Sequence, residues 1–529
     1  MPPSITLSKL AWSTPDGRPL FTDLDLSFGA DCSGLVGRNG VGKSTLLKLI
    51  SGDLAPQSGQ VSVTGTLGVL RQAVLEEPNQ TVADLFGATE GLTVLRRSER
   101  GEADGEELAR ADWTLEARLR TALDRLGLDA EPGTPLSRLS GGQRTRIGLA
   151  ALVFAESDFI LLDEPTNNLD RAGRLAVIDL LAGWRSGAIV VSHDRELLDT
   201  LDAIVELTSL AATRYGGNYS RYRERKALEL EAARHDLANA DRRVAEVAQR
   251  AQATAERKAR KDHTGRKKRA KGDIPRLQMN TQKSGSENTS GGNARLAELR
   301  RAQALDDAAA ARRRIEILQP LSVTLPPPHL PAARVVLAIE RASVGYVPPY
   351  GQEAQPVIRD LSFTITGPER VAVTGPNGSG KSTLLALVTG ALVPWTGTVQ
   401  VMTEFAMLDQ QVSLLDPSTS IRDNFCRLNP QADENACRAS LARFMFRANS
   451  VLQIVATLSG GQVLRAGLAC VLGVAPPALL ILDEPTNNLD LDSIAAVEAG
   501  LRAYDGALLV VSHDETFLGA IAITRRLAL

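Results

Sequence analysis

The sequence is poor in the features that mark secreted and membrane proteins. No apolar run reaches the roughly 18 residues that a membrane helix needs, and the N-terminal MPPSITLSKL does not resemble a signal peptide. Only four cysteines occur, too far apart for a metal knuckle and in no disulfide-rich pattern: Cys32, Cys426, Cys437 and Cys470. We therefore expect a cytoplasmic protein with free thiols and no membrane partner.

The chain also lacks an excess of charge and of aromatic residues. Its formal net charge is −2 and aromatic residues make up 4%. No overall field draws such a chain to nucleic acid or to a membrane, so any such attraction must be local. With 529 residues it is too long for one ordinary core, which predicts more than one domain.

Four short motifs occur twice, in the same order. The first copy has GRNGVGKST, LSGGQ, DEPTNNLD and VVSHD at Gly37–Thr45, Leu139–Gln143, Asp163–Asp170 and Val190–Asp194. The second has GPNGSGKST, LSGGQ, DEPTNNLD and VVSHD at Gly375–Thr383, Leu458–Gln462, Asp483–Asp490 and Val510–Asp514. Such self-similarity predicts two domains of one fold.

The spacing between the motifs places an insertion in the first copy. Lys43 and Lys381 are 338 positions apart, whereas Ser140 and Ser459 are 319 apart, which leaves 19 extra residues in copy one. We expect them in the polar stretch 87–108, as a surface feature without chemistry of its own. The second copy has no such stretch.

The predicted domains are residues 1–215, a linker over 216–333, and residues 334–529. Residues 219–262 and 293–318 are rich in Ala, Arg, Glu and Leu and contain neither Pro nor Gly, which favours long helices. The Gly, Pro and Ser of 263–292 should interrupt them. The linker is therefore expected to be a helical hairpin, followed by a stiff tether over 319–331.

Each G-x-x-x-x-G-K-S after an apolar strand predicts a phosphate-binding loop. Its glycines let backbone N–H groups surround phosphate oxygens at a helix N-terminus. Lys43 and Lys381 should reach the β- and γ-phosphates, and Ser44 and Ser382 should coordinate Mg²⁺. One such match alone could be a Gly-rich turn with a surface lysine; two with their companions favour nucleotide binding.

The apolar strands that follow each LSGGQ end in two carboxylates. The first, Asp163 or Asp483, is placed to hold Mg²⁺, and the second can accept a proton from the attacking water. A histidine follows another apolar strand and could reach the γ-phosphate, although an isolated histidine is more often structural. The predicted catalytic residues are Glu164, His193, Glu484 and His513.

Both copies resemble ATP-binding-cassette nucleotide-binding domains, with LSGGQ as the discriminating motif. The resemblance implies an α/β fold with two P-loop cassettes, an ATPase activity, and head-to-tail pairing in which each phosphate loop faces the other copy's LSGGQ. It implies a monomer with intramolecular pairing of its cassettes. It also implies that Trp12 and Tyr346 stack on adenine, for which ordinary packing is the alternative.

The resemblance implies ATP and Mg²⁺ as cofactors. The residues expected to bind ATP are Trp12, Gly37, Asn39, Gly40, Gly42, Lys43, Ser44, Thr45, Gln72, Ser140, Gly141, Gly142, Tyr346, Gly375, Asn377, Gly378, Gly380, Lys381, Ser382, Thr383, Gln410, Ser459, Gly460 and Gly461. Those expected to hold the metal are Ser44, Gln72, Asp163, Ser382, Gln410 and Asp483.

EPTNNLD and the charged linker resemble the ABC-F subfamily, although many members have NHLD where Asn168 and Asn488 stand here. The resemblance implies binding to the ribosome near the tRNA exit site, with the linker acting on P-site tRNA and the peptidyl-transferase centre. Arg257 to Arg276 hold ten Lys or Arg against two Asp, which suits phosphate contacts with rRNA and tRNA. A translation factor and an antibiotic-resistance ribosomal protection protein both fit.

Three other functions remain open. An ATPase component of an ABC transporter with a separate membrane subunit accounts for both cassettes but leaves the basic linker unexplained. A DNA-maintenance ATPase usually carries its coiled coil within one cassette, whereas this linker lies between two. A non-catalytic switch is disfavoured because Glu164 and Glu484 are both present.

Overall fold

The structure is a computed structural model that describes residues 3–70, 80–208, 211–269, 298–299, 302–307, 309, 325–346, 355–446 and 448–529. The chain separates into two compact units. One comprises Met1–Ser220 with Pro320–Leu529 and holds both copies of the repeat; the other comprises Arg221–Gln319. None of the described helices is long and apolar enough to cross a membrane.

The first cassette is built on two sheets. A three-stranded antiparallel sheet has the order β2-β1-β4, from Pro19–Phe28, Ser4–Ser13 and Ser58–Thr64. A six-stranded sheet has the order β5-β6-β7-β3-β8-β9, from Leu67–Leu70, Phe159–Asp163, Gly187–Val191, Cys32–Val36, Ala203–Leu207 and Ala212–Gly216. Only β9 is antiparallel to its neighbour. Apolar side chains from both sheets and from α1 (Lys43–Ser51) form a shared core.

The other helices of this cassette follow the phosphate loop in the chain. They are α2 (Val82–Leu85), α3 (Thr89–Glu99), α4 (Gly105–Arg110), α5 (Leu115–Asp124), α6 (Gly141–Phe154), α7 (Arg171–Ala182) and α8 (Arg195–Leu198), with a 3₁₀ turn at Leu136–Arg138.

The predicted insertion folds as helices α3 and α4. Asp104 and Glu107 form a capping box at the start of α4, and Arg97 of α3 forms an ion pair with Glu107. Because these contacts connect the two helices, the inserted stretch has a structure of its own. None of the residues of α4 is buried, as expected of a surface feature, whereas α3 buries Leu92 and Leu95 against the cassette.

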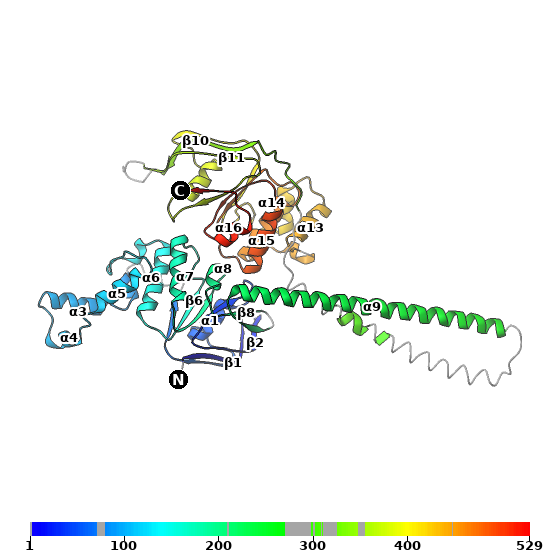
Figure 1. Ribbon diagram of the computed structural model, residues 1–529, viewed down its shortest axis with the longest axis horizontal. Coiled ribbons are helices and arrows are strands. Elements are labelled where there is room, and N and C mark those ends of the chain that lie inside the picture. The colour runs from blue at the N-terminus through cyan, green and yellow to red at the C-terminus, as the bar shows by residue number, and fades with distance from the viewer. Residues whose placement is uncertain are drawn as a thin grey trace. The chain divides into compact units, whose positions relative to one another are not determined.

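The second cassette repeats this plan. Its antiparallel sheet has the order β11-β10-β13, from Pro356–Thr366, Val335–Gly345 and Thr396–Val401. Its parallel sheet has the order β14-β15-β16-β12-β17, from Phe405–Leu408, Leu479–Asp483, Ala507–Val511, Arg370–Thr374 and Arg525–Ala528. The helices are α11 (Lys381–Val388), α12 (Ile421–Leu428), α13 (Glu434–Arg443), α14 (Gly460–Leu472), α15 (Leu491–Ala503) and α16 (Glu515–Ala520), with 3₁₀ turns at Ala448–Leu452 and Val455–Thr457. The mixed α/β fold with two cassettes is confirmed (Figure 1).

The parallel sheets position the motifs. Strands such as FILLD and LLILD are apolar along their length and buried. In the second cassette one face of β15 packs against α11 and the antiparallel sheet, and the other packs against α14 and α15. The carboxyl ends of parallel strands lie at one edge of a sheet, so the loops after β3, β6 and β7 come together there. These loops carry the phosphate loop, DEPTNNLD and SHD.

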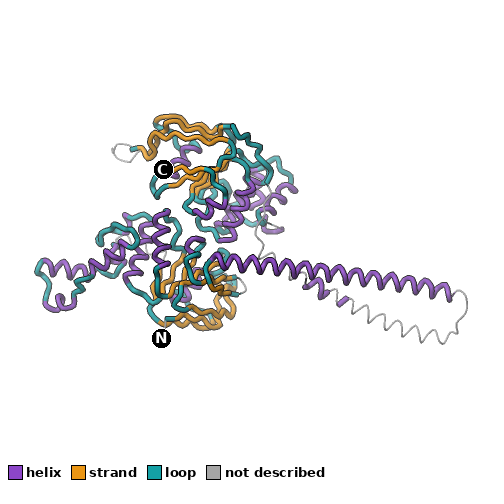
Figure 2. The backbone as a smooth tube through the Cα atoms, in the orientation of Figure 1, coloured by secondary structure: helices purple, strands orange, loops and turns teal. Residues whose placement is uncertain are grey.

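The linker helix is longer than its sequence predicts. The prediction that the helix is interrupted from His263 onward is wrong for His263–Arg269, because α9 runs unbroken from Tyr219 to Arg269 (Figure 2). One Gly in a helix costs about 1 kcal/mol, which many surrounding helix formers offset at Gly265. The 51 residues span about 75 Å at ~1.5 Å each. The rest of the expected interruption, residues 270–292, lies outside the described residues. Within the second stretch expected to be helical, 293–318, the described residues 298–299, 302–307 and 309 are helical.

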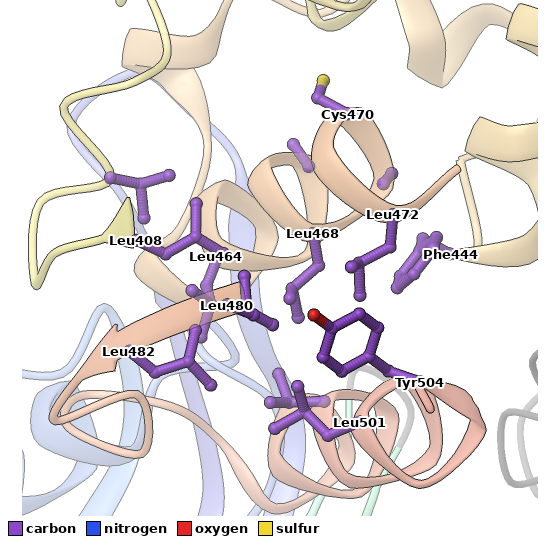
Figure 3. Close-up of a cluster of buried hydrophobic side chains, with 14 of the residues drawn as sticks. Leu408, Phe444, Leu464, Leu468, Cys470, Leu472, Leu480, Leu482, Leu501 and Tyr504 are labelled. Atoms are coloured by element: carbon purple, nitrogen blue, oxygen red, sulfur yellow. The ribbon is translucent and has the colours of Figure 1, made fainter. Parts of the chain in front are cut away.

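Tyr504 shows how a polar group is accommodated in the second core. Its ring lies among Leu468, Leu472 and Leu501 (Figure 3), and only 1% of the residue is exposed. The hydroxyl donates to the carbonyl oxygen of Pro477 at 2.7 Å. The side chain thus ties the entry to β15 to the turn before β16.

Tyr504→Phe should lower the free energy of unfolding by about 1–2 kcal/mol, because the carbonyl oxygens of Pro477 and of the buried Ala507 lose their donor while the packing stays. Urea denaturation followed by circular dichroism measures this change. Tyr346→Phe, at an exposed tyrosine, is the matched control and should shift the midpoint little. Equal midpoints for the Tyr504→Phe variant and the unmodified protein would contradict the role of this hydrogen bond.

Candidate nucleotide-binding sites

The two phosphate loops have the same backbone. Gly37, Gly40 and Gly42 have φ of 150°, 80° and 107°, and Gly375, Gly378 and Gly380 have 150°, 85° and 103°. A Cβ at Gly42 would lie 2.7 Å from the Phe21 ring, so glycine is required there by space as well as by φ. Neither α1 nor α11 has a side-chain cap, which leaves the first amides of each helix for an anion.

Each loop lysine bonds its own loop. Lys43 Nζ donates to the Gly37 carbonyl oxygen at 2.7 Å, and Lys381 Nζ donates to that of Gly375 at 2.9 Å. Both lysines are buried, and this burial lowers their pKa values, against the opposing effect of nearby carboxylates. Ser44 and Ser382 follow as exposed side chains, whereas Thr383 is buried and Thr45 is half-buried.

The paired carboxylates lie at the ends of β6 and β15, as predicted. Glu164 and Glu484 have φ of 49° and 46°, and their amides donate to the carbonyl oxygens of Val191 and Val511 at 2.9 Å. A left-handed backbone at a non-glycine residue is strained and is typical of functional sites. Burial raises the pKa of Glu164 to about 8 and that of Glu484 to about 7.

The structure brings each histidine to its glutamate. His193 Nε2 lies 3.2 Å from Glu164 Oε1, and His513 Nε2 lies 3.5 Å from Glu484 Oε1. Burial, with the neighbouring loop lysine, lowers the pKa of His193 to about 3 and that of His513 to about 4. These buried Nε2 atoms have no hydrogen bond of good geometry among the described residues. Each histidine is therefore neutral and able to bond a further group.

Contacts join the two copies through their phosphate loops. The Asn39 amide donates to Asp490 Oδ2 at 2.8 Å, and its side-chain nitrogen donates to the carbonyl oxygen of Asn488 at 3.0 Å. The matching bonds from Asn377 to Asp170 and Asn168 measure 3.4 and 3.1 Å. Each phosphate loop thus meets the end of the other copy's DEPTNNLD.

These aspartates were missed as site residues in the sequence analysis. Asp490 also caps α15 by accepting from the Ser493 amide at 2.8 Å, and Asp170 caps α7 from the Gly173 amide at 3.0 Å. Although burial opposes it, hydrogen bonds keep the pKa of each carboxyl below its usual value. The sequence did hold a signal for these two aspartates, because the DEPTNNLD repeat is identical through its eighth residue, which is the aspartate itself.

The LSGGQ segments begin helices. Ser140 and Ser459 form capping boxes at α6 and α14 with Gln143 and Gln462, and the glycine pairs after them are the first helical residues. A cavity of about 330 Å³ is lined by Ser140 and Gly142 of one copy and by Asn377 and Gly378 of the other. In one of the two predicted pairings, the LSGGQ of one copy and the phosphate loop of the other therefore line a single cavity.

A second cavity, of about 340 Å³, contains most of the residues predicted beside the second loop. Its lining includes Tyr346, Lys381, Ser382, Thr383, Gln410, Asp483 and Glu484. The Tyr346 hydroxyl lies 3.3 Å from Thr383 Oγ1, with the tyrosine largely exposed. Trp12 instead packs half-buried against the first core. Gln72 lies outside the described residues.

Among the described residues, ion pairs between the copies occur on one side. Arg38 and Asp492 form an exposed pair at 2.9 Å, and Arg195 forms a buried pair with Glu498. The corresponding residues on the other side are Pro376 with Ala172 and Glu515 with Ile178, which form no such pairs. The region around the first phosphate loop therefore has two ion pairs that the corresponding described residues on the other side do not form.

The chain has many relatives. The family model described as ABC transporter matches residues 22–167 and 358–487. The tylosin resistance ATP-binding protein TlrC of Streptomyces fradiae is 32% identical, over 94% of this chain and 92% of that protein. The energy-dependent translational throttle protein EttA of Mycobacterium tuberculosis (strain H37Rv) is 30% identical, over 94% and 87%.

Two solved structures share the fold across 98% of this chain at 18% identity. One is the archaeal ribosome recycling factor in complex with the ribosomal stalk protein aP1, with a TM-score of 0.55 over 87% of that chain. The other is titled RNase-L Inhibitor, with a TM-score of 0.51 over 86% of that chain. With both motif sets in place and relatives aligned over nearly its whole length, the chain belongs to the ABC-F subfamily of ATP-binding cassette proteins and is an ATP-hydrolysing enzyme.

Proposed function

We propose that this ATPase works on the ribosome in the cytoplasm through two composite ATP sites. The first site joins Gly37–Thr45 to the second copy's Ser459, Gly460 and Gly461; the second joins Gly375–Thr383 to Ser140, Gly141 and Gly142. The hydrogen bonds of Asn39 and Asn377 to the opposite copy support this pairing. ATP bound between the copies would favour their closed arrangement, and hydrolysis would remove that preference.

The described residues fit ATP with Mg²⁺. The uncapped helix N-termini and the glycine cradles suit phosphates, and Lys43 and Lys381 would exchange carbonyl partners for phosphate oxygens. Tyr346 suits stacking on adenine better than Trp12, whose side chain is used in packing. The metal would be held by Ser44, Asp163 and Gln72 at one site and by Ser382, Asp483 and Gln410 at the other, and it would supply charge stabilisation.

Glu164 and Glu484 are proposed as the groups that orient the attacking water and accept its proton. A carboxyl whose pKa burial raises is a stronger base when ionised than an ordinary glutamate. His193 and His513, neutral beside these carboxyls, would hydrogen-bond the γ-phosphate region. The left-handed backbone at each glutamate is a strained conformation of the kind found at functional sites.

Changing Glu164 and Glu484 together to Gln should reduce ATP turnover by roughly 100-fold or more, because the proton acceptor is lost while ATP binding is kept. The variant should co-sediment with ribosomes when ATP is present. A Lys43→Ala/Lys381→Ala variant, impaired in phosphate binding, is the control that should not co-sediment. If the Gln variant with bound ATP sediments apart from ribosomes, ribosome action is refuted.

Titration of the same glutamates should make the stability of nucleotide-free protein depend on pH. Between pH 6.5, the usual pKa of histidine, and about 8, His193 and His513 are neutral in the folded chain and go from half protonated to neutral in the unfolded chain, which opposes the effect of the glutamates only in part. Glu164 and Glu484 remain partly protonated only when folded. The free energy of unfolding should therefore fall as pH rises, by on the order of 2 kcal/mol.

Denaturant titrations at several pH values measure this slope. The Glu164→Gln/Glu484→Gln variant is the control, since Gln does not titrate, and its slope over the same window should be flatter. A variant slope as steep as that of the unmodified protein would assign the dependence to other groups.

Two observations support the ribosome as partner. A relative that aligns along nearly the whole chain is named a translational throttle. The end of α9 carries exposed Arg257 and Arg260 within the stretch Arg257 to Arg276, where ten Lys or Arg outnumber two Asp. A basic helix of this length suits contacts with rRNA and P-site tRNA near the peptidyl-transferase centre. We propose a monomer, with domains 1–215, 216–333 and 334–529.

Antibiotic resistance of the ribosomal protection type is the more specific candidate, because TlrC, named for tylosin resistance, aligns with 94% of this chain. Expression in a tylosin-susceptible host should raise the minimum inhibitory concentration at least about fourfold, which corresponds to under 1 kcal/mol. The Glu164→Gln/Glu484→Gln variant is the control and should give no increase. Unchanged susceptibility to tylosin with normal ribosome binding would favour a translation factor or a different drug.

A further inference from the structure

One cavity is shared by the catalytic residues proposed for both sites. It measures about 250 Å³, and its lining includes Glu164, His193, Glu484, His513, Asp194 and Asp514. Arg174 is the one arginine or lysine among the described residues that line it. In a cavity lined by this many acidic groups, the positive charge of the one arginine interacts strongly with the neighbouring carboxylates.

Arg174 is held in place by its own cassette. It lies on α7, four residues after Asp170, and its Nε and Nη2 donate to Asp194 Oδ2 at 3.0 and 2.9 Å. The Arg174 and Asp194 side chains are 14% and 5% exposed. A guanidinium bonded twice to a buried carboxylate has little freedom to turn.

The second cassette has no counterpart of this arginine. The position 320 residues after Arg174 is Ile494, which is 2% exposed in the apolar core. Asp514, which matches Asp194, still caps its helix by accepting from the Phe517 amide at 2.9 Å. The aspartate therefore forms its cap without an arginine, so capping does not account for Arg174.

Arg174 lies close in the chain to residues that contact the second site. The segment just before it, from Asn168 to Asp170, bonds Asn377 of the second phosphate loop. Its charge, together with the larger effect of Lys381, opposes the rise in the pKa of Glu484 that burial and Asp483 cause. It also acts with burial and Lys381 to lower the pKa of His513, against Asp170.

We propose that Arg174 is a positioning residue supplied by the first cassette to the second ATP site, where it orients the Glu484 carboxylate toward the attacking water. The proposal rests on the catalytic role proposed above for Glu484. The first site has Ile494 at the matching place, so Glu164 works without such a cation. The two sites are then unequal in chemistry, and hydrolysis at the second depends on closure of the two copies.

The test isolates the second site in a Glu164→Gln background. Arg174→Met should lower kcat about tenfold and leave KM for ATP within about twofold, because orientation of the reacting groups is lost while ATP contacts remain. Arg174→Lys, which keeps the charge, should recover most of kcat. Arg171→Met is the matched control on the same helix, where Arg171 pairs with Glu196, and should leave kcat unchanged.

The opposite background, Glu484→Gln, provides the decisive comparison. A loss of kcat confined to that background would mean that Arg174 acts through Asp194 on His193, which overturns the proposal, as would unchanged kcat in the Glu164→Gln background. Thermal melting reports folding, and Arg174→Gln replaces the Met variant if that one does not fold. Full turnover in the Glu164→Gln/Glu484→Gln variant would instead refute the catalytic glutamates themselves.

Discussion

The composite sites depend on one interaction, a hydrogen bond from a backbone amide of the phosphate loop to an aspartate of the other copy. Asp490 accepts from the Asn39 amide with one oxygen and from the first turn of α15 with the other. A carboxylate shared in this way fixes the distance between a phosphate loop and the opposite helix. Helix α14, which begins at the second LSGGQ, packs against α15, so the position of this LSGGQ relative to the phosphate loop is fixed as well.

The duplicated DEPTNNLD stretch therefore serves both cassettes. Its first residue ends a buried strand and its second follows that strand. Its last residue reaches the phosphate loop of the other copy. One rigid turn, with left-handed backbone at Glu484 and Asn488, connects these two roles. Strain at two residues of an eight-residue turn indicates that its course is set by function as well as by local preference.

The sequence predicts the parts of the site that lie within one copy. Glycines, lysines and carboxylates follow apolar strands at fixed spacing, so their meeting at one sheet edge follows from the parallel fold. It did not reveal Arg174, Asp170 or Asp490, since their contacts join residues whose proximity only the paired fold sets. It also placed the interruption of α9 too early, because a composition rule cannot weigh Gly265 against its helical neighbours.

The buried pair of Arg195 and Glu498 has a consequence for temperature. When the copies separate at this point, both charges return to water, so hydration of the open state offsets most of the attraction in the closed one. That hydration becomes less favourable on heating. Separation of the copies should therefore become harder on the side of the first phosphate loop as temperature rises. On the opposite side the matching residues, Ile178 and Glu515, form no ion pair with each other and so contribute no such temperature dependence.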